Sequence, residues 1–355
     1  MAQKSFWKFI GGSASFLAKG FKDPSVLYIP LANEAGMMSS ITPQLKGDIK
    51  ADNNSFLTRP TSRADLTFTN SCRGFWVYLN KSGKTWSLSG ESDNRSISVE
   101  AGLLYHKITR KNSRLGLEAK ITNFVPATKD RVELMLVKLT NTSRKNIELT
   151  ATSAIPIFAR SADNLRDHRH VTSLLNRIRQ DKYAVVDQPL MSFAERSHKI
   201  NEKAYYVLGF DSHGQPPQGS FPTLESFIGA GASLDEPISV IKNLAPKRLG
   251  EQQLSGKEAM AALRFRTKML KPKQSLCFAL VLGIAENQAG ITKAFHKFNS
   301  INKINSSLEQ TKKFWENKTG ELLFQTKDQT YDGWLRWVSL QPMLRRILGC
   351  SFLPD

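Results

Sequence analysis

Cysteine is scarce, and its spacing excludes a common class of site. The chain has three cysteines, Cys72, Cys277 and Cys350. They lie too far apart in the sequence for a Cys-x-x-Cys pair, which excludes the usual thiolate motif for metal or redox chemistry. Cysteines without such a framework fit a reducing compartment, so we expect a cytoplasmic protein.

Long apolar runs are missing as well. A membrane-spanning helix needs roughly 18 to 20 consecutive apolar residues, and no stretch of the sequence is that long. Near the amino terminus, Lys8 and several glycines interrupt the apolar core that a signal peptide would need, and Lys19 ends it. We therefore expect no membrane partner, and we interpret residues 1–20 as a lead-in segment.

Several motifs of catalysis are also absent. No Gly-x-Ser-x-Gly elbow, P-loop or Gly-x-Gly-x-x-Gly precedes a predicted helix, so a serine hydrolase, an NTPase and a dinucleotide-binding protein find no support. Carboxylates are plentiful, but without a position in a fold none can be assigned as acid or base.

Acidic residues are outnumbered, and this raises a rival function. The sequence has 50 Lys+Arg against 31 Asp+Glu, a formal net charge of +19, which attracts polyanions such as nucleic acid. The basic residues are spread in short groups such as Arg144-Lys145, Lys312-Lys313 and Arg345-Arg346. No helix-turn-helix, zinc finger or RNP-like signature concentrates them. We expect a solvated basic surface without a specific nucleic-acid partner, and a polyanion-binding surface protein stays as an alternative.

Short β-branched and apolar runs dominate the sequence up to Ile284. Within them, side chains alternate, as in Leu115, Leu117, Ala119 and Ile121, which would face one side of a sheet. The segment 132–155 reads as two strands around a turn at 141–146, which predicts a hairpin. So many strands with few helices between them predict a mainly β protein with antiparallel sheets stacked as a sandwich.

Helical spacing appears in two places. Val171, Leu174, Leu175 and Ile178 form an amphipathic stripe, which predicts a short helix around 162–180 that interrupts the sandwich. After residue 285 the helical period persists, which predicts one or two linker helices. A last helix follows over 331–349, with Pro342 expected to kink or restart it.

Two groups of side chains are candidates for binding. Asp167, His168 and His170 are of the types that ligate zinc or iron, but no third ligand can be named. We therefore expect local hydrogen bonds there and no metal site.

The second group lies on the last predicted helix. Trp334, Trp337, Val338 and Gln341 fall on one helical face, and Trp334 and Trp337 could stack on sugar rings while Arg336, Gln341, Arg345 and Arg346 bind hydroxyl groups. The alternative is that the aromatic rings are simply the buried face of the helix.

Several segments resemble one known family. They are YIPLANEAGMMSSITPQLKGDIKADNNSFLTRPTSRADL at 28–66, SCRGFWVYL at 71–79, TWSLSG at 85–90, ADNLRDHRHVTSLLNRI at 162–178 and WLRWVSLQPMLRRILGCSFLP at 334–354. They resemble the cellobiose-phosphorylase-like family, also called glycosyltransferase-36-like or glycoside hydrolase family 94. Within it, the phosphorylases of β-1,2-linked glucose oligomers look most similar.

The resemblance implies a domain order. Such enzymes consist of a large β-supersandwich, a helical linker, an (α/α)6 barrel with the active site and a small terminal sheet. This implies that 21–285 is the sandwich, 286–320 the linker and 321–355 the start of a truncated barrel. The missing barrel would come from downstream sequence, and a homodimer is also expected.

The resemblance also implies a reaction. Inorganic phosphate, as co-substrate, attacks the anomeric carbon of a β-glucan oligosaccharide while one carboxylic acid protonates the leaving oxygen, and no cofactor is needed. The family places this acid and an Arg-Asp sugar-binding motif beyond the stretch matched here. We therefore assign no catalytic residue and expect the chain to be inactive alone.

Substrate contacts are expected from Arg73, Trp334, Arg336, Gln341 and Arg345. Gly74 follows Arg73 where the family usually has Asn, and the alternative for Arg73 is an ion pair with a carboxylate at a strand edge. For the whole chain, the alternative is a stand-alone carbohydrate-binding or scaffold β-sandwich without catalysis.

Overall fold

The computed structural model describes residues 6–10, 14–20, 27–62, 72–90, 97–165, 167, 169–194 and 197–348. Its architecture is mainly β, with antiparallel sheets, as predicted. The largest sheet has ten strands. In spatial order they are β1 (Phe6–Phe9), β2 (Phe16–Lys19), β9 (Ser98–Gly102), β10 (Tyr105–Asn112), β11 (Leu117–Phe124), β12 (Val132–Asn141), β22 (Ser275–Ala285), β18 (Ala204–Asp211), β15 (Ala184–Asp187) and β14 (Ile178–Gln180).

A six-stranded sheet packs against its inner face. It contains β19 (Gly219–Thr223), β20 (Ala259–Arg264), β13 (Ile147–Pro156), β7 (Gly74–Leu79) and β8 (Lys84–Ser87), with β21 (Lys268–Leu270) paired to β13. A four-stranded sheet adds β3 (Ile29–Ala32), β4 (Met38–Ile41), β5 (Ile49–Asp52) and β6 (Ser55–Phe56). A ribbon of β16 (Met191–Ala194) and β17 (Ser197–Ile200) stands apart from these sheets.

The predicted alternation decides which side chains form the core. Leu117, Ala119 and Ile121 on β11 are buried in the main cluster between the sheets, and Leu115 packs at its edge. The neighbouring strand β12 is apolar on both faces because helices cover its outer side.

The predicted hairpin at 132–155 is wrong. β12 pairs with β11 and β22 in the ten-stranded sheet, whereas β13 pairs with β7, β20 and β21 in the six-stranded sheet. The turn at 141–146 is therefore an arch between two sheets. Asn141 stabilises it, because its side-chain amide donates to Lys145 O at 2.7 Å and to Leu270 O at 2.8 Å.

The predicted helix at 162–180 is much shorter. Among the described residues of this segment, the helices are η3 (Ala162–Leu165) and α2 (Arg169–Ser173), and Ile178 begins strand β14. Val171 and Leu174 are exposed, so the apparent stripe is not a buried helical face. The sequence also gave no sign of three short helices between β19 and β20, namely α3 (Leu224–Ile228), α4 (Ile238–Ile241) and α5 (Glu251–Leu254).

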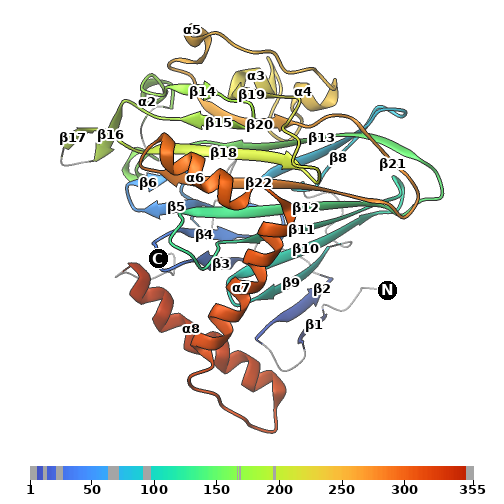
Figure 1. The fold of residues 1–355 in the computed structure, drawn as a ribbon, viewed down its shortest axis with the longest axis vertical. Helices are drawn as coiled ribbons and strands as arrows, with labels where there is room; N and C mark the ends of the chain where they lie inside the picture. The colour runs from blue at the N-terminus through green and yellow to red at the C-terminus, as the bar shows by residue number, and fades with distance from the viewer. Residues whose placement is uncertain are drawn as a thin grey trace.

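Helices follow the last strand, as the change of period predicted. β22 ends at Ala285, and α6 (Gln288–Phe298) and α7 (Ile301–Thr319) cross the outer face of the ten-stranded sheet (Figure 1). Asn287 and Ser300 cap them by accepting hydrogen bonds from Gly290 N and Lys303 N. α8 (Gln329–Leu348) follows and continues through Pro342 as one element. Its assignment to a barrel stays a prediction.

Candidate functional site

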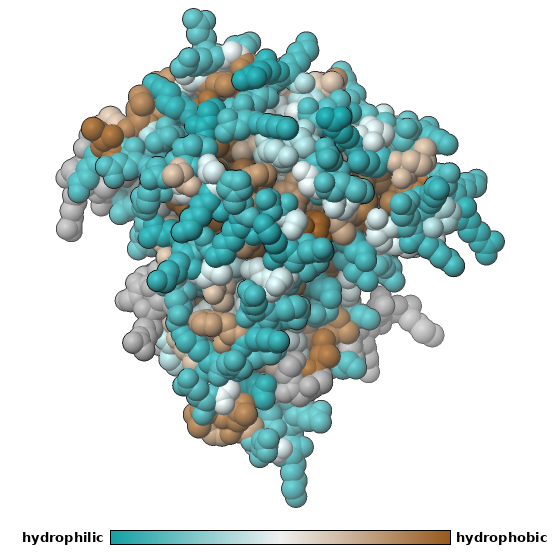
Figure 2. Space-filling view, in the orientation of Figure 1, coloured by the Kyte–Doolittle hydropathy of each residue, from teal (hydrophilic) through white to brown (hydrophobic). Residues whose placement is uncertain are grey.

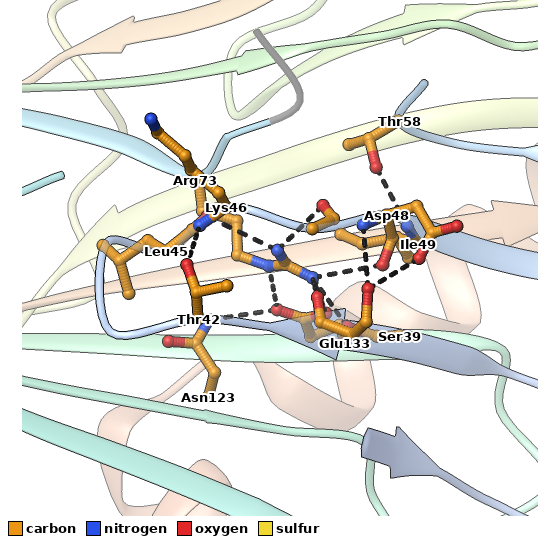
Figure 3. Close-up of polar contacts among 12 residues, drawn as sticks. Ser39, Thr42, Leu45, Lys46, Asp48, Ile49, Thr58, Arg73, Asn123 and Glu133 are labelled. Carbon is orange, nitrogen blue, oxygen red and sulfur yellow. Dashed lines mark hydrogen bonds and ion pairs between the residues drawn. The ribbon is translucent and has the colours of Figure 1, made fainter. Parts of the chain in front are cut away.

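Arg73, a predicted substrate contact, lies inside the protein just before β7. Its side chain is fully buried. Nε donates to Glu133 Oε1 at 2.5 Å and Nη2 donates to Glu133 Oε2 at 2.8 Å, and Nη2 also donates to Ser39 Oγ at 2.6 Å (Figure 3). The carboxylate belongs to β12 and the hydroxyl to β4. The guanidinium therefore joins the ten-stranded sheet to the four-stranded sheet.

The turn between β4 and β5 completes the surroundings of Arg73. Nη1 donates to Gly47 O at 3.1 Å. Gly47 has a φ of 130°, and a Cβ there would lie 2.1 Å from Ser40 O, so only glycine fits. Because no part of the Arg73 side chain is exposed, this placement supports a structural role and gives no support to direct contact with a ligand.

Two more polar side chains extend this cluster along the inner face of the large sheet. Asn123 Nδ2 donates to Glu133 Oε1 at 3.0 Å, and His106 lies opposite Asn123 on β10. Neither ring nitrogen of His106 has a hydrogen-bond partner in the described part of the chain. Burial, with the nearby Arg73 charge, lowers the pKa of His106 to about 3. The imidazole is therefore neutral at ordinary pH.

Trp334 and Trp337 were predicted to share one face of the last helix, either as sugar contacts or as its buried face, and their exposure differs. Trp334 is 54% exposed and stacks on Tyr331, with ring centroids 5.8 Å apart. Trp337 instead faces inward, and its indole Nε1 donates to Ala14 O at 2.7 Å. Leu340 is fully buried in a cluster with Trp315. Trp337 therefore fits the interpretation of a buried helical face, whereas Trp334 remains exposed.

The other predicted sugar contacts on α8 do not gather on one side of the helix. Arg336 and Gln341 are half-buried, and their spacing places them on opposite sides of α8. Arg345 lies in the last turns of the helix, and its side chain is outside the described residues. Arg73, buried in the sandwich, does not join these residues in one site.

The region of the imagined metal ligands shows local bonding. Asn164 Nδ2 donates to Asp167 Oδ2 at 2.8 Å. His168 and the side chain of His170 lie outside the described residues. Among the residues that the structure describes, no three His, Cys, Asp or Glu gather as a metal site would require. None of the helices in the described residues is long and apolar enough to cross a membrane.

Sequence reasoning missed a buried carboxyl group. Asp187 on β15 is fully buried, and its Oδ1 accepts a hydrogen bond from Arg177 N at 3.1 Å. Burial raises the pKa of Asp187 to about 7, although the positive charges of Arg160 and Arg177 oppose the shift. Nothing in the local sequence distinguishes this aspartate, because its burial depends on strands far away in the chain.

The surface has two hollows worth naming. One of about 70 Å³ is lined by Arg59, Phe158, Arg160, Asn176, Leu224 and Glu258, among others. The second, of about 310 Å³, lies between three turns at one end of the sandwich. Apolar side chains also gather at the lower end of the molecule, over the connection between α7 and α8, where Leu322, Leu323 and Phe324 are exposed (Figure 2).

Comparison with known proteins identifies the sandwich. A family model described as "Glycosyl hydrolase 94, supersandwich domain" matches residues 49–301. The matched stretch runs from β5 to the first residue of α7 and so contains most of both large sheets. None of the curated proteins matches the sequence.

Several solved structures have a similar general form. A GalM/aldose epimerase homologue from C. elegans is 12% identical with a TM-score of 0.42, and the alignment covers 73% of this chain and 98% of that one. A bacterial glucoamylase complexed with acarbose is 9% identical with a TM-score of 0.41, over 93% of this chain and 39% of that one. A family GH92 α-mannosidase from Bacteroides thetaiotaomicron is 11% identical with a TM-score of 0.37, over 93% and 37%.

These likenesses are weak, and no functional conclusion follows from TM-scores of this size. The chain spans only part of some of these proteins, namely 32% of a similar polysaccharide lyase and 39% of the glucoamylase.

Proposed function

This chain belongs to the glycosyl hydrolase 94 supersandwich family, and from that membership we propose that it is the amino-terminal scaffold of an inverting glycoside phosphorylase. The proposed substrates are β-glucan oligosaccharides, with β-1,2-linked glucose oligomers first among them. The observation that carries the proposal is the family match over residues 49–301, which spans the sandwich and reaches the helices packed on it. The segments that resemble phosphorylases add support at the level of the reaction.

The helices after the sandwich suit a scaffold. α6 and α7 pack on the outer face of the ten-stranded sheet through Ile291, Phe298 and Ile304, and α8 packs on α7 through Leu340 and Leu344. On the other side of α8, Trp334 and Val338 remain exposed. In the proposed enzyme, α8 is the first helix of an (α/α)6 barrel, and this exposed side packs against the helices that follow.

The proposed chemistry needs one proton donor from the barrel. Phosphate attacks the anomeric carbon as a charged nucleophile, so a single general acid that protonates the leaving oxygen suffices. We assign that role to no residue of this chain. Gln341, Arg345 and Arg336 remain proposed sugar contacts, and the enzyme is proposed to be a cytoplasmic homodimer that requires no cofactor.

An activity assay tests the proposal. The chain alone and the chain joined to a barrel encoded downstream would each be incubated with β-1,2-glucan oligomers and with cellobiose, with and without phosphate. The joined protein should release α-glucose 1-phosphate only when phosphate is present, and the chain alone should release none. Hydrolysis that does not depend on phosphate would exclude this reaction class, and turnover by the chain alone would place the active site within it.

The second candidate is a stand-alone carbohydrate-binding module. It is favoured by the exposed, stacked rings of Tyr331 and Trp334, because aromatic faces bind sugar rings. Calorimetric titration with β-glucan oligomers would detect such binding, and Trp334→Ala should abolish it. Leu174→Ala is the matched control, because Leu174 is 62% exposed at a distant position on the sandwich. Equal affinity of both variants would exclude Trp334 as the binding residue.

A further inference from the structure

Three turns surround an open groove of about 310 Å³ at one end of the sandwich. The β7–β8 turn contributes Lys81 and Ser82, and the β10–β11 turn contributes Ser113 and Arg114. The β12–β13 arch contributes Ser143, Lys145 and Asn146, and the start of β13 contributes Ile147 and Glu148. These segments are far apart in sequence, so no linear motif announces the groove. The fold alone brings their side chains together.

Hydrogen bonds hold the walls of the groove in place. Thr142 N donates to Gly116 O at 2.8 Å and so ties the arch to the β10–β11 turn. Asn80 N donates to Glu148 O at 3.0 Å and ties the β7–β8 turn to β13. Within the arch, Asn141 Oδ1 accepts from Ser143 N and Ser143 Oγ at 2.8 and 2.7 Å. The groove is therefore formed before any ligand arrives, which lowers the entropic cost of binding.

The groove is strongly basic. Lys81, Arg114 and Lys145 line it, all three are exposed, and Glu148 is the single carboxylate among the lining residues. None of the three cations forms an ion pair within the described part of the chain.

Nearby lysines behave differently. Lys111 and Lys120 bind Glu118, at 3.3 and 3.4 Å. Glu148 lines the groove but forms no ion pair with Lys81, Arg114 or Lys145 among the described residues. Lys81, Arg114 and Lys145 are therefore available to bind an anion from solution.

We propose that this groove binds the phosphoryl group of a small ligand. Arg114 offers a planar fork that suits two oxygens of one phosphate, while Lys81 and Lys145 add point charges. The Ser82 and Ser113 hydroxyls provide further donors of the kind that phosphate oxygens accept. The ligand is either inorganic phosphate or a phosphate ester, and the site is separate from the proposed catalytic barrel. The proposal stands whether or not the chain belongs to a phosphorylase.

Thermal unfolding of the full chain at constant ionic strength tests the proposal. Inorganic phosphate, glucose 1-phosphate and glucose are titrated separately, and sodium chloride keeps the ionic strength fixed. A ligand that binds the folded state raises the unfolding midpoint in proportion to RT ln(1 + [L]/Kd). We expect a saturable rise with both phosphate compounds and none with glucose. Tighter binding of glucose 1-phosphate than of inorganic phosphate identifies an ester as the ligand. Equal or tighter binding of inorganic phosphate identifies the free anion.

Two variants locate the binding. Arg114→Gln should weaken it about tenfold, because one charge-assisted pair with a phosphate is lost. The matched control is Arg248→Gln, which removes an exposed arginine that does not line the groove. Equal weakening by both variants would show a general charge effect and overturn the site. The absence of any saturable rise in the unfolding midpoint would overturn the site as well. So would a preference for duplex DNA over the phosphate compounds that Arg114→Gln leaves unchanged.

Discussion

Arg73 and Glu133, 60 residues apart in the sequence, form a buried ion pair, with contacts of 2.5 Å between Nε and Oε1 and 2.8 Å between Nη2 and Oε2. Both side chains have no exposed surface. Removing one partner of such a pair leaves an uncompensated charge in the interior, whereas removing both does not. The pair should therefore show strong coupling in a double-mutant cycle.

The first prediction follows from that coupling. Arg73→Met should lower the free energy of unfolding by about 3 to 5 kcal/mol, and the Arg73→Met/Glu133→Leu double variant should recover a large part of the loss. Urea unfolding measures both. Lys257→Met serves as the control, because it breaks an exposed pair with Glu225 at 3.2 Å and should cost less than about 1 kcal/mol. Equal losses for Arg73→Met and the control would contradict this account.

A second prediction concerns His106 and low pH. Because burial lowers the pKa of His106 to about 3 from its ordinary 6.5, the unfolded chain binds a proton there before the folded protein does. Stability is therefore complete above about pH 6.5 and falls toward pH 3, by about 1.4 kcal/mol per pH unit from this group. His106→Leu should remove that dependence. Unfolding curves recorded between pH 4 and 7 that are equally steep in both proteins would refute the prediction.

Asp187 should act in the opposite direction. Its pKa is raised by burial from 3.8 to about 7, so the folded protein holds a proton that the unfolded chain has lost. Stability from this group is highest below about pH 4 and falls as the pH rises to about 7. Asp187→Asn should therefore stabilise the protein at pH 8 and change little at pH 4. Asp181→Asn, at an exposed position, is the control. If Asp187→Asn stabilises the protein at pH 8 no more than Asp181→Asn does, Asp187 is not a buried neutral carboxyl.

The fourth prediction concerns α8. Leu340 and Leu344 of this helix are buried against α7. Deletion of residues 321–355 would therefore uncover apolar surface on the rest of the protein. Leu340→Ala should cost about 2 to 5 kcal/mol of unfolding free energy. Val338→Ala, at a position 41% exposed on the same helix, should cost less than about 1 kcal/mol. Similar losses at the two positions, measured by urea unfolding, would mean that α8 does not pack as described.

Local pattern in the sequence was enough for the strands and for the change to helices. Leu117, Ala119 and Ile121 alternate and all enter the core, because a strand of an antiparallel sheet exposes alternate residues to opposite faces. The end of the last strand at Ala285 coincides with the change of period. The same pattern misled at 171–178, since an apolar residue at a helical interval need not be buried, and Leu174 is 62% exposed.

Partners far apart in sequence could not be predicted. The strands at 132–141 and 147–156 look like a hairpin, but pairing depends on which strands lie beside each, and they enter different sheets. For the same reason, a carboxylate was expected for Arg73 as an alternative, but its identity as Glu133 depends on the packing of two sheets. The phosphate groove also escaped detection, because its cations come from three separate turns.

The last prediction concerns nucleic acid. The net charge of +19 is large, yet several cations are engaged with carboxylates, as in the Lys111–Glu118 and Lys107–Glu100 pairs. The rest are distributed over many elements, so few can touch one duplex at once. Binding to DNA should be weak and independent of sequence. If about two phosphates are neutralised, affinity should fall about tenfold between about 50 and 200 mM salt. Fluorescence anisotropy with two unrelated duplexes at each salt concentration measures both properties. Tight binding at physiological salt with a preference for one duplex would show that the charge is focused after all, and would make nucleic acid the leading partner.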